Sequence, residues 1–394
     1  MALTKIKTGS VSDSITLTTP DINGDTIDAT VIGGTTPAVA TFTSASDAAG
    51  NVRSGRKNLI INGGMTISQK GTSAIPTVNG AVTTCDRFMS EYTGYFINKS
   101  EQVDDSPVGF SKSLKVTCTA VSGSKDANTY LIAFESRLEN DLGIATGVGK
   151  TGTKPFTISF WIKSNQTGTK MFDVVYNNYS GNRNLSKSYT INSADTWEYK
   201  TITFPACTAS GSAAATGLKD VSFYWWMDAG ANFASGTERT AWGPLDNTSR
   251  AAGVGTNAGV NSYWQMTGVQ LEVGSVATDF EHRSYGEELA LCQRYYEVVS
   301  TTTDSDGNRY NGIAWSVSNI NVFIPFRVTK RANPTLTISA NGQVFIAAWY
   351  NATGTAVTGT SERGCTISVQ RTNSYTAKYG YFIKGQSITA NAEL

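Results

Sequence analysis

The residues best suited to chemistry lie in the stretch TDFEHRSYGEELALCQRYYE, which holds the one histidine of the chain. His282 stands between Glu281 and Arg283 and is followed by the carboxylate pair Glu287 and Glu288. A Ser-His-Asp or Cys-His hydrolase would have to use this imidazole as its near-neutral base. A run of charged residues just before a helix cap favours a solvated or backbone-bonded histidine instead. We therefore assign no catalytic residue and expect no enzyme.

Paired carboxylates are the second possible source of chemistry, because glycoside hydrolysis uses two acids facing each other across the sugar. Asp104 and Asp105 are neighbours in sequence, as are Glu287 and Glu288, and adjacent strand residues point to opposite faces. A hydrolytic pair would have to come from distant positions. A glycan-cleaving enzyme therefore stays open as an alternative function.

Charge and hydropathy exclude two classes of partner. Lys and Arg number 32 against 31 Asp and Glu, and charged residues make up 16% of the chain. No broad field exists to attract phosphates or anionic lipid, so we expect no nucleic acid partner. No stretch approaches the roughly 20 apolar residues that a spanning helix needs, so we expect no membrane insertion. The segment MALTKIKTGSVSDS lacks the apolar run of a signal peptide, which predicts a protein assembled in the cytoplasm.

Sequence motifs for binding a metal ion or a nucleotide are incomplete in this chain. Its five cysteines are widely spread and never form a CxxC pair, which argues against a disulfide framework and a zinc site. Gly147, Gly149 and Gly152 match GxGxxG, but Ile144 stands where a phosphate loop needs glycine and Pro155 leads into a strand instead of a helix. No cofactor and no metal are expected.

Aromatic residues carry the clearest binding signal. A long polar segment between Met227 and Tyr263 contains Trp242, and long loops on rigid β scaffolds are often functional. Indole faces stack on the apolar faces of sugars while nearby polar groups bind the hydroxyls. The sequence therefore predicts a glycan platform whose residues are Trp242, Arg239, Asp246 and Asn247.

Three further rings alternate away from the apolar face of their strands. Tyr224 and Trp226 point opposite to Trp225, and Trp161 points opposite to Phe160. Tyr224, Trp226 and Trp161 are therefore further glycan-binding candidates. The alternative is that these rings pack beneath a loop, a second layer or a neighbouring subunit.

The elements that position these residues are predominantly strands. The stretch SLKVTCTA places Leu114, Val116 and Cys118 on one face, and TISFWIKS, VSFYWWMD and TGVQLEVGS repeat this period of two. Many short strands separated by Gly and Asn turns predict a mainly β fold with an antiparallel jelly roll or β-sandwich over residues 58–283.

A helix signal follows this region. Ser284 and Glu287 form a capping-box pattern, which predicts a linking helix over residues 284–299. We expect its packing face to carry Leu289, Cys292 and Tyr296. After it the alternation resumes in NINVFIPFRV, which predicts a small β-sandwich domain over residues 300–394.

The N-terminal residues 1–57 have a different pattern. Ile22, Ile27 and Val31 recur every four or five positions between turn formers. Such a thread buries no core alone, so three or more chains would have to supply one another's apolar contacts. The pattern predicts an intertwined β stalk for attachment and trimerisation. The alternative is a disordered linker.

Several of these stretches together resemble the body of tail-fibre proteins of tailed bacteriophages, marine ones in particular. The stretches are KNLIINGGMTISQKGTS, CDRFMSEY, TISFWIKSNQTGT, DTWEYKTITFP and above all WQMTGVQLEVGSVATDFEHRSYGEELALCQRYYE. DINGDTIDATVIGGTTPAVATFTS is similar to the stalk repeats of that group, and IPFRVTKRANPTLTI with the terminal NAEL is similar to its C-terminal domain. The likeness touches nearly the whole chain.

The resemblance implies a homotrimeric virion fibre that binds other tail or virion proteins through its N-terminus and a host cell-surface glycan through a jelly roll similar to carbohydrate-binding domains. A tailspike that acts as a polysaccharide depolymerase and a purely structural virion fibre or connector are the alternatives. Jelly rolls of this kind often open on an NGxFE-like calcium motif, but here Thr66 replaces the acid after Asn62. That replacement leaves the implied calcium site without one of its ligands.

Overall fold

The computed structural model describes most of the chain from Ser46 onward. It describes residues 46–47, 50–51, 56–74, 84–139, 145–146, 153–178, 182–207, 218–300, 310–338, 342–345, 349–372, 375–376, 379–384 and 387–393. Most of the predicted stalk, residues 1–45, lies outside the described residues. Short strands β1 (Ser46–Asp47) and β2 (Gly50–Asn51) pair just after it.

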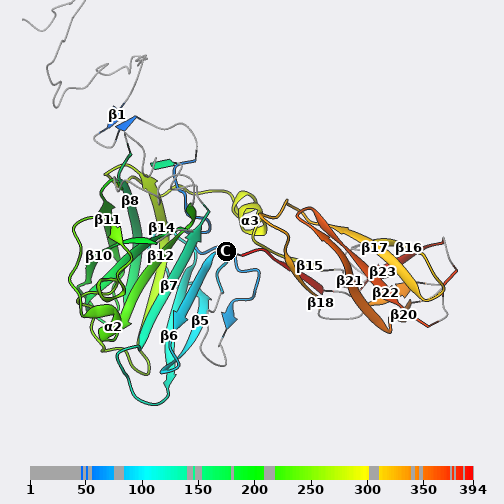
Figure 1. The fold of residues 1–394 in the computed structure, drawn as a ribbon, viewed down its shortest axis with the longest axis horizontal. Coiled ribbons are helices and arrows are strands. Elements are labelled where there is room, and N and C mark those ends of the chain that lie inside the picture. Colours follow the sequence, from blue (N-terminus) through cyan, green and yellow to red (C-terminus); the bar gives the residue numbers. More distant parts are fainter. Residues whose placement is uncertain are drawn as a thin grey trace, which may run out of the picture. The chain divides into compact units, whose positions relative to one another are not determined.

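Two antiparallel six-stranded sheets form the central sandwich (Figure 1). Sheet I has the order β11 (Glu198–Phe204), β8 (Phe156–Ser164), β14 (Tyr263–Val273), β6 (Ser113–Val121), β5 (Phe96–Val103) and β3 (Ser73–Ala74). Sheet II has the order β13 (Gly243–Pro244), β10 (Arg183–Ile191), β9 (Gly168–Asn178), β12 (Leu218–Ala229), β7 (Tyr130–Leu138) and β4 (Phe88–Tyr92). The prediction of a mainly β sandwich of the jelly-roll kind is confirmed.

The core lies between the two sheets and follows the predicted alternation. Ile158, Phe160 and Ile162 of β8 are fully buried, as are Phe223 and Trp225 of β12. Aromatic rings meet across the core: the Phe160 and Trp225 ring centroids lie 5.7 Å apart at an interplanar angle of 84°. Residues of the opposite parity on each strand must then face outward, toward solvent or an overlying loop.

The long segment after β12 folds back over the outer face of sheet II. It contains α2 (Ala231–Ala234) and the 3₁₀-helix η1 (Asn247–Ser249), and the Ala251 amide donates to the Phe233 carbonyl. A second apolar cluster forms beneath it, with Ile132, Met171, Trp226, Ala229, Ala251, Ala252 and Val254 buried. This face of the sandwich is therefore packed.

Helix α3 (Tyr285–Gln293) follows the sandwich and begins with the predicted capping box. The Ser284 hydroxyl accepts from the Glu287 amide, and the Glu287 carboxylate accepts from the Ser284 amide. The helix ends at Gln293 and not at residue 299, because residues Tyr296–Ser300 form strand β15 and pair with β24 (Ser387–Asn391).

One residue of the predicted packing face of α3 is wrong. Cys292 and Tyr295 are buried with Ile61 and Ile67, and Leu289 packs against them. Tyr295 therefore takes the place expected for Tyr296. The chain turns out of the helix at Tyr295, whose amide donates to the Cys292 carbonyl, and this changes the side-chain periodicity.

A second core follows α3. A three-stranded sheet has the order β15, β24 and β18 (Thr335–Ile338). A seven-stranded sheet has the order β20 (Trp349–Asn351), β19 (Gln343–Phe345), β23 (Gly380–Lys384), β16 (Tyr310–Ala314), β17 (Asn319–Pro325), β22 (Gly364–Gln370) and β21 (Gly354–Ser361). Ile320, Val322 and Ile324 of β17 are buried in it as predicted.

Two sequence features take structural roles. All five cysteines are buried, and none of them forms a disulfide bond. The Asn62 side chain accepts from the Ile67 amide and donates to the Ile67 and Asp86 carbonyls, so it links two loops of the sandwich. No helix of the described residues is long and apolar enough to span a bilayer.

Candidate functional site

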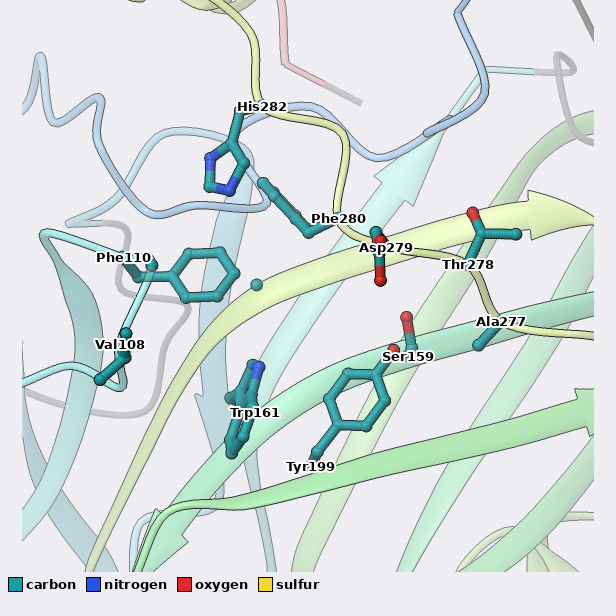
Figure 2. A pocket seen from close by; sticks show the side chains of 12 residues that line it. Val108, Phe110, Ser159, Trp161, Tyr199, Ala277, Thr278, Asp279, Phe280 and His282 are labelled. Carbon is teal, nitrogen blue, oxygen red and sulfur yellow. The ribbon is translucent and has the colours of Figure 1, made fainter. Parts of the chain in front are cut away.

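A cavity of about 380 Å³ opens on the outer face of sheet I (Figure 2). Five rings line it: Phe110, Trp161, Tyr199, Phe280 and His282. Ser159, Gly268, Asp279 and four further residues complete the lining. A concave site with several aromatic faces and a few polar groups is the usual form of a small-molecule site.

Strands β8, β11 and β14 supply the floor. Ser159 and Trp161 alternate with the buried Ile158, Phe160 and Ile162, so they point away from the core. Tyr199 of β11 is paired with Trp161 in the sheet register, and the two ring centroids lie 5.3 Å apart at an interplanar angle of 47°. The two rings therefore form adjoining, tilted walls.

Gly268 gives the rings room. It lies at a register shift of β14 against β8 and has φ +63°, a conformation that glycine adopts at low cost. A Cβ atom at this position would lie 2.6 Å from Phe110 Cζ and 3.0 Å from Trp161 Cδ1. A side chain here would therefore displace the rings that line the cavity.

The loop between β5 and β6 brings Phe110 to the cavity and is held by Asp105. The Asp105 carboxylate accepts from Lys163 Nζ at 2.7 Å, Trp197 Nε1 at 3.2 Å and Gln265 Nε2 at 3.2 Å. Burial raises the pKa of Asp105, but these hydrogen bonds outweigh burial and hold the pKa below its usual range. The ionised carboxylate therefore stabilises the loop at neutral pH.

The opposite wall is the segment after β14, which two buried side chains of that strand hold in place. Gln270 Nε2 donates to the Thr278 and Asp279 carbonyls, and Gln270 Oε1 accepts from the Glu281 amide. Glu272 accepts from the Thr278 amide and hydroxyl, both at 2.8 Å. These bonds position the Asp279, Phe280 and His282 side chains without any regular secondary structure.

The rings of this wall contact the ring of the β5–β6 loop. The Phe280 and His282 centroids lie 4.9 Å apart, Phe110 and Phe280 also 4.9 Å, and Phe110 and His282 5.5 Å. His282 is exposed and packs between two apolar rings. It therefore lines a cavity, a position that its place before a helix cap did not indicate.

Uncommitted polar groups share the cavity. The Ser159 hydroxyl, the Tyr199 hydroxyl and the Asp279 carboxylate have no hydrogen-bond partner among the described residues. Figure 2 shows the oxygen atoms of these three side chains directed toward the same part of the cavity. They are free to bind the hydroxyl or amino groups of a ligand.

Of the seven sequence candidates, the structure places Trp161 in this cavity and the other six elsewhere. Trp242 is partly buried against the core: its centroid lies 4.8 Å from Tyr176, and its indole N–H donates to the Pro205 carbonyl at 2.8 Å. Its ring faces are therefore used in packing. In the structure Trp242 thus makes packing contacts, and the glycan platform around it stays a prediction.

The polar residues expected beside Trp242 form hydrogen bonds that hold the loop carrying Trp242. Arg239 Nη1 donates to Asn184 Oδ1 and to the Pro244 carbonyl. Asp246 caps η1 by accepting from the Thr248 amide, and hydrogen bonds with Thr248 hold the pKa of Asp246 below its usual range. Asn247 is exposed on η1. These groups give the long loop its shape.

Trp226 and Tyr224 lie on the outer face of sheet II, under the same loop. Trp226 is 1% exposed, and its centroid lies 5.2 Å from that of Phe233 in α2. The Arg250 guanidinium lies 4.6 Å from the Tyr224 centroid and 5.0 Å from the Trp226 centroid. Sheet II separates these rings from Trp161, so they belong to another face of the sandwich.

The sheet II face also holds buried charges. Glu135 is fully buried and accepts from Arg137 Nε at 2.7 Å, and burial, together with the Glu91 carboxylate, raises the pKa of Glu135 to about 7 against the opposing effect of Arg137. Arg250 Nε lies 2.6 Å from the buried Asp173 carboxylate.

Among the described residues no group of three His, Cys, Asp or Glu side chains could hold a metal ion.

Comparisons with known proteins found similarity to solved structures only. No protein-family model matches the chain, and the search of curated proteins returned no match. A tailspike protein 4 domain of bacteriophage CBA120, described as enzymatically active, is 12% identical and covers 55% of this chain and 21% of its own, with a TM-score of 0.30. The matched region is thus about a fifth of the tailspike chain.

Two other similar structures are matched over their whole length. A putative sugar-binding protein of Bacteroides thetaiotaomicron is 9% identical, with a TM-score of 0.31, and covers 55% of this chain. A family 11 carbohydrate-binding module of a Clostridium thermocellum cellulase is 12% identical, with a TM-score of 0.26, and covers 53%. Folds of this kind carry many functions, so the ligand must be argued from the site.

Proposed function

We propose that this chain is a non-enzymatic glycan-binding protein whose cavity on sheet I stacks a sugar ring against Trp161 and Tyr199. One observation carries the proposal: two tilted aromatic walls stand beside uncommitted oxygen atoms in one cavity. The apolar face of a pyranose matches the rings, and its hydroxyls match Ser159, Tyr199 and Asp279. The cavity volume of about 380 Å³ favours one or two sugar units at a chain end or branch.

We propose further that the chain acts as a bacteriophage tail fibre in the virion and adheres to a host surface glycan. The likeness of its sequence to tail-fibre bodies supports this role. Assembly as a homotrimer through residues 1–57 would link three such cavities, and linked weak sites raise avidity by about 10²–10⁴ without tight single binding. Other virion proteins would bind the same N-terminal segment.

Binding is favoured over cleavage of the glycan by the position of the carboxylates. A retaining or inverting glycosidase places two acids on either side of the bond to be cleaved. The cavity lining contributes one carboxylate, that of Asp279. Glu135, whose raised pKa would suit a general acid, is fully buried on the other face of the sandwich.

A glycan array probed with the purified chain, followed by calorimetry with the best ligand, tests the proposal. Trp161→Ala and Tyr199→Ala are expected to weaken binding by about tenfold or more, as central aromatic contacts do. Trp315→Ala is the matched control, because Trp315 is 63% exposed in the C-terminal sandwich. Unchanged affinity in both cavity variants would refute the site.

A further inference from the structure

The cavity has a charge pattern that bears on which sugars it can hold. Asp279 supplies the one carboxylate among the twelve lining residues, and none of the twelve is lysine or arginine. All twelve belong to the described part of the chain. The Asp279 carboxylate is exposed and has no ion-pair partner among the described residues. A ligand in the cavity therefore meets a carboxylate that forms no salt bridge.

The cations nearest in sequence to the lining are bound elsewhere. Lys163 pairs with Asp105, and Arg283 pairs with Glu281 and Glu288. Lys200 pairs with Glu198, and Lys112 pairs with Asp104. Lys57 Nζ donates to the Thr278 hydroxyl and to the backbone carbonyl of Asp279. Lys57 does not line the cavity, so it lowers the negative potential of this wall without offering its ammonium group to a ligand.

The nearby carboxylates are also committed. Glu272 accepts two hydrogen bonds from Thr278, and Asp105 accepts from Lys163, Trp197 and Gln265. Asp279 is thus the acid that remains for a ligand. The Asp279 carboxylate makes no hydrogen bond or ion pair with the described residues, so it has no evident role in holding this wall in place.

The aromatic rings favour the same sign of charge. The faces of Trp161, Tyr199 and Phe110 carry the negative part of the ring quadrupole, which attracts ammonium groups. A carboxylate ligand would meet these faces and the Asp279 carboxylate, and both would disfavour it. Ring faces and carboxylate together make the recognition pattern of an organic cation.

We propose that the cavity selects sugars bearing a free amino group over N-acylated sugars and over uronic acids. The ammonium group would pair with Asp279 beside the rings, while the Ser159 and Tyr199 hydroxyls bind sugar oxygens. The two hydroxyls favour an amino sugar over a simple alkylammonium ion, which would leave them unpaired. This inference rests on the proposed glycan-binding function and adds the ligand class.

Ligand-observed NMR titrations with the methyl glycosides of glucosamine, N-acetylglucosamine and glucuronic acid test the selectivity. The titrations are run at about pH 7, where a sugar amino group, like an α-amino group, is still largely protonated. The chain is expected to bind the glucosamine glycoside about 3- to 30-fold more tightly than the N-acetyl glycoside, and the uronic acid most weakly. Added salt should reduce the advantage because the charges are near solvent.

Two variants decide the role of Asp279. Asp279→Asn should abolish the preference for the amino sugar, so that the glucosamine and N-acetylglucosamine glycosides bind with about equal affinity. Asp104→Asn is the control, because Asp104 is an exposed acid of the β5–β6 loop that pairs with Lys112 and does not line the cavity. It should keep the selectivity.

The outcomes separate the two proposals. Equal affinities for the amino and N-acetyl glycosides, a preference for the uronic acid, or full selectivity in Asp279→Asn would overturn the inference while sugar binding itself stands. If none of the glycosides binds and the glycan array is also blank, the proposed function fails with it.

Discussion

Gly268 and Phe110 are in such close contact that a Cβ atom on Gly268 would lie 2.6 Å from Phe110 Cζ. The pair joins the register shift of β14 to the loop that carries Phe110, and the lack of a side chain at residue 268 leaves room for the Phe110 ring that lines the cavity. This contact, the Trp161 and Tyr199 pair and the segment held by Gln270 are separate structural devices. Each can be tested by substitution.

Gly268→Ala should lower both stability and ligand affinity. The alanine adds left-handed backbone strain of roughly 1–2 kcal/mol and an overpacking cost of about 1–3 kcal/mol against Phe110 and Trp161. Gly123→Ala is the control, because Gly123 has φ +77° and an added Cβ would have nothing within 4 Å. Urea unfolding of the two variants isolates the packing cost. Equal losses would show that the rings move aside freely.

Gln270→Leu should loosen the wall that carries Phe280 and His282. The change removes three hydrogen bonds between β14 and this segment, at a cost of about 1–3 kcal/mol for the buried groups left unpaired. Sugar affinity should fall with it. Gln102→Leu loses a hydrogen bond to the Met65 carbonyl elsewhere on sheet I and should leave affinity intact. If both variants bind alike, Gln270 does not position the wall.

Trp242→Ala should destabilise the sandwich by about 2–4 kcal/mol and leave ligand binding unchanged in the protein that remains folded. Its ring packs against Tyr176, Phe156 and Phe204 at the edge of the core, and its N–H group is bonded to a carbonyl. Thermal unfolding and a titration with the array ligand measure the two effects. A loss of affinity at unchanged stability would restore Trp242 as a binding residue.

Glu135 should make stability fall as pH rises. Its pKa is about 7 in the folded chain and ordinary in the unfolded chain, so between about pH 4.5 and 7 the folded state holds a proton that the unfolded state has lost. The stability that Glu135 contributes is full below this range and lost above it, by on the order of 1–3 kcal/mol.

Glu135→Gln supplies the reference for this pH effect, because the amide does not titrate. Urea unfolding from pH 5 to 8 should show the parent losing stability relative to this variant up to about pH 7 and running parallel above it. Parallel curves over the whole range would mean that Glu135 titrates alike in both states.

Local sequence determined the strands, the capping box and the inward faces. Ile158, Phe160 and Ile162 alternate as β geometry requires, and Ser284 with Glu287 sets the start of α3, because these features depend on neighbours in sequence. The same alternation placed Trp161 on the outer face. Nothing local distinguished it from Trp226, which alternates in the same way and is covered by a loop.

Tertiary structure decided which outward rings are accessible and what they stand beside. Phe110, Tyr199, Phe280 and His282 come from three separate segments and meet on sheet I because Asp105, Gln270 and Glu272 hold two loops over it. The alternation of residues along a strand shows which side chains share a face, but it does not show the path of a loop. The path of these loops depends on side-chain hydrogen bonds between residues up to 160 positions apart. Accessibility and proximity are for this reason properties of the folded chain.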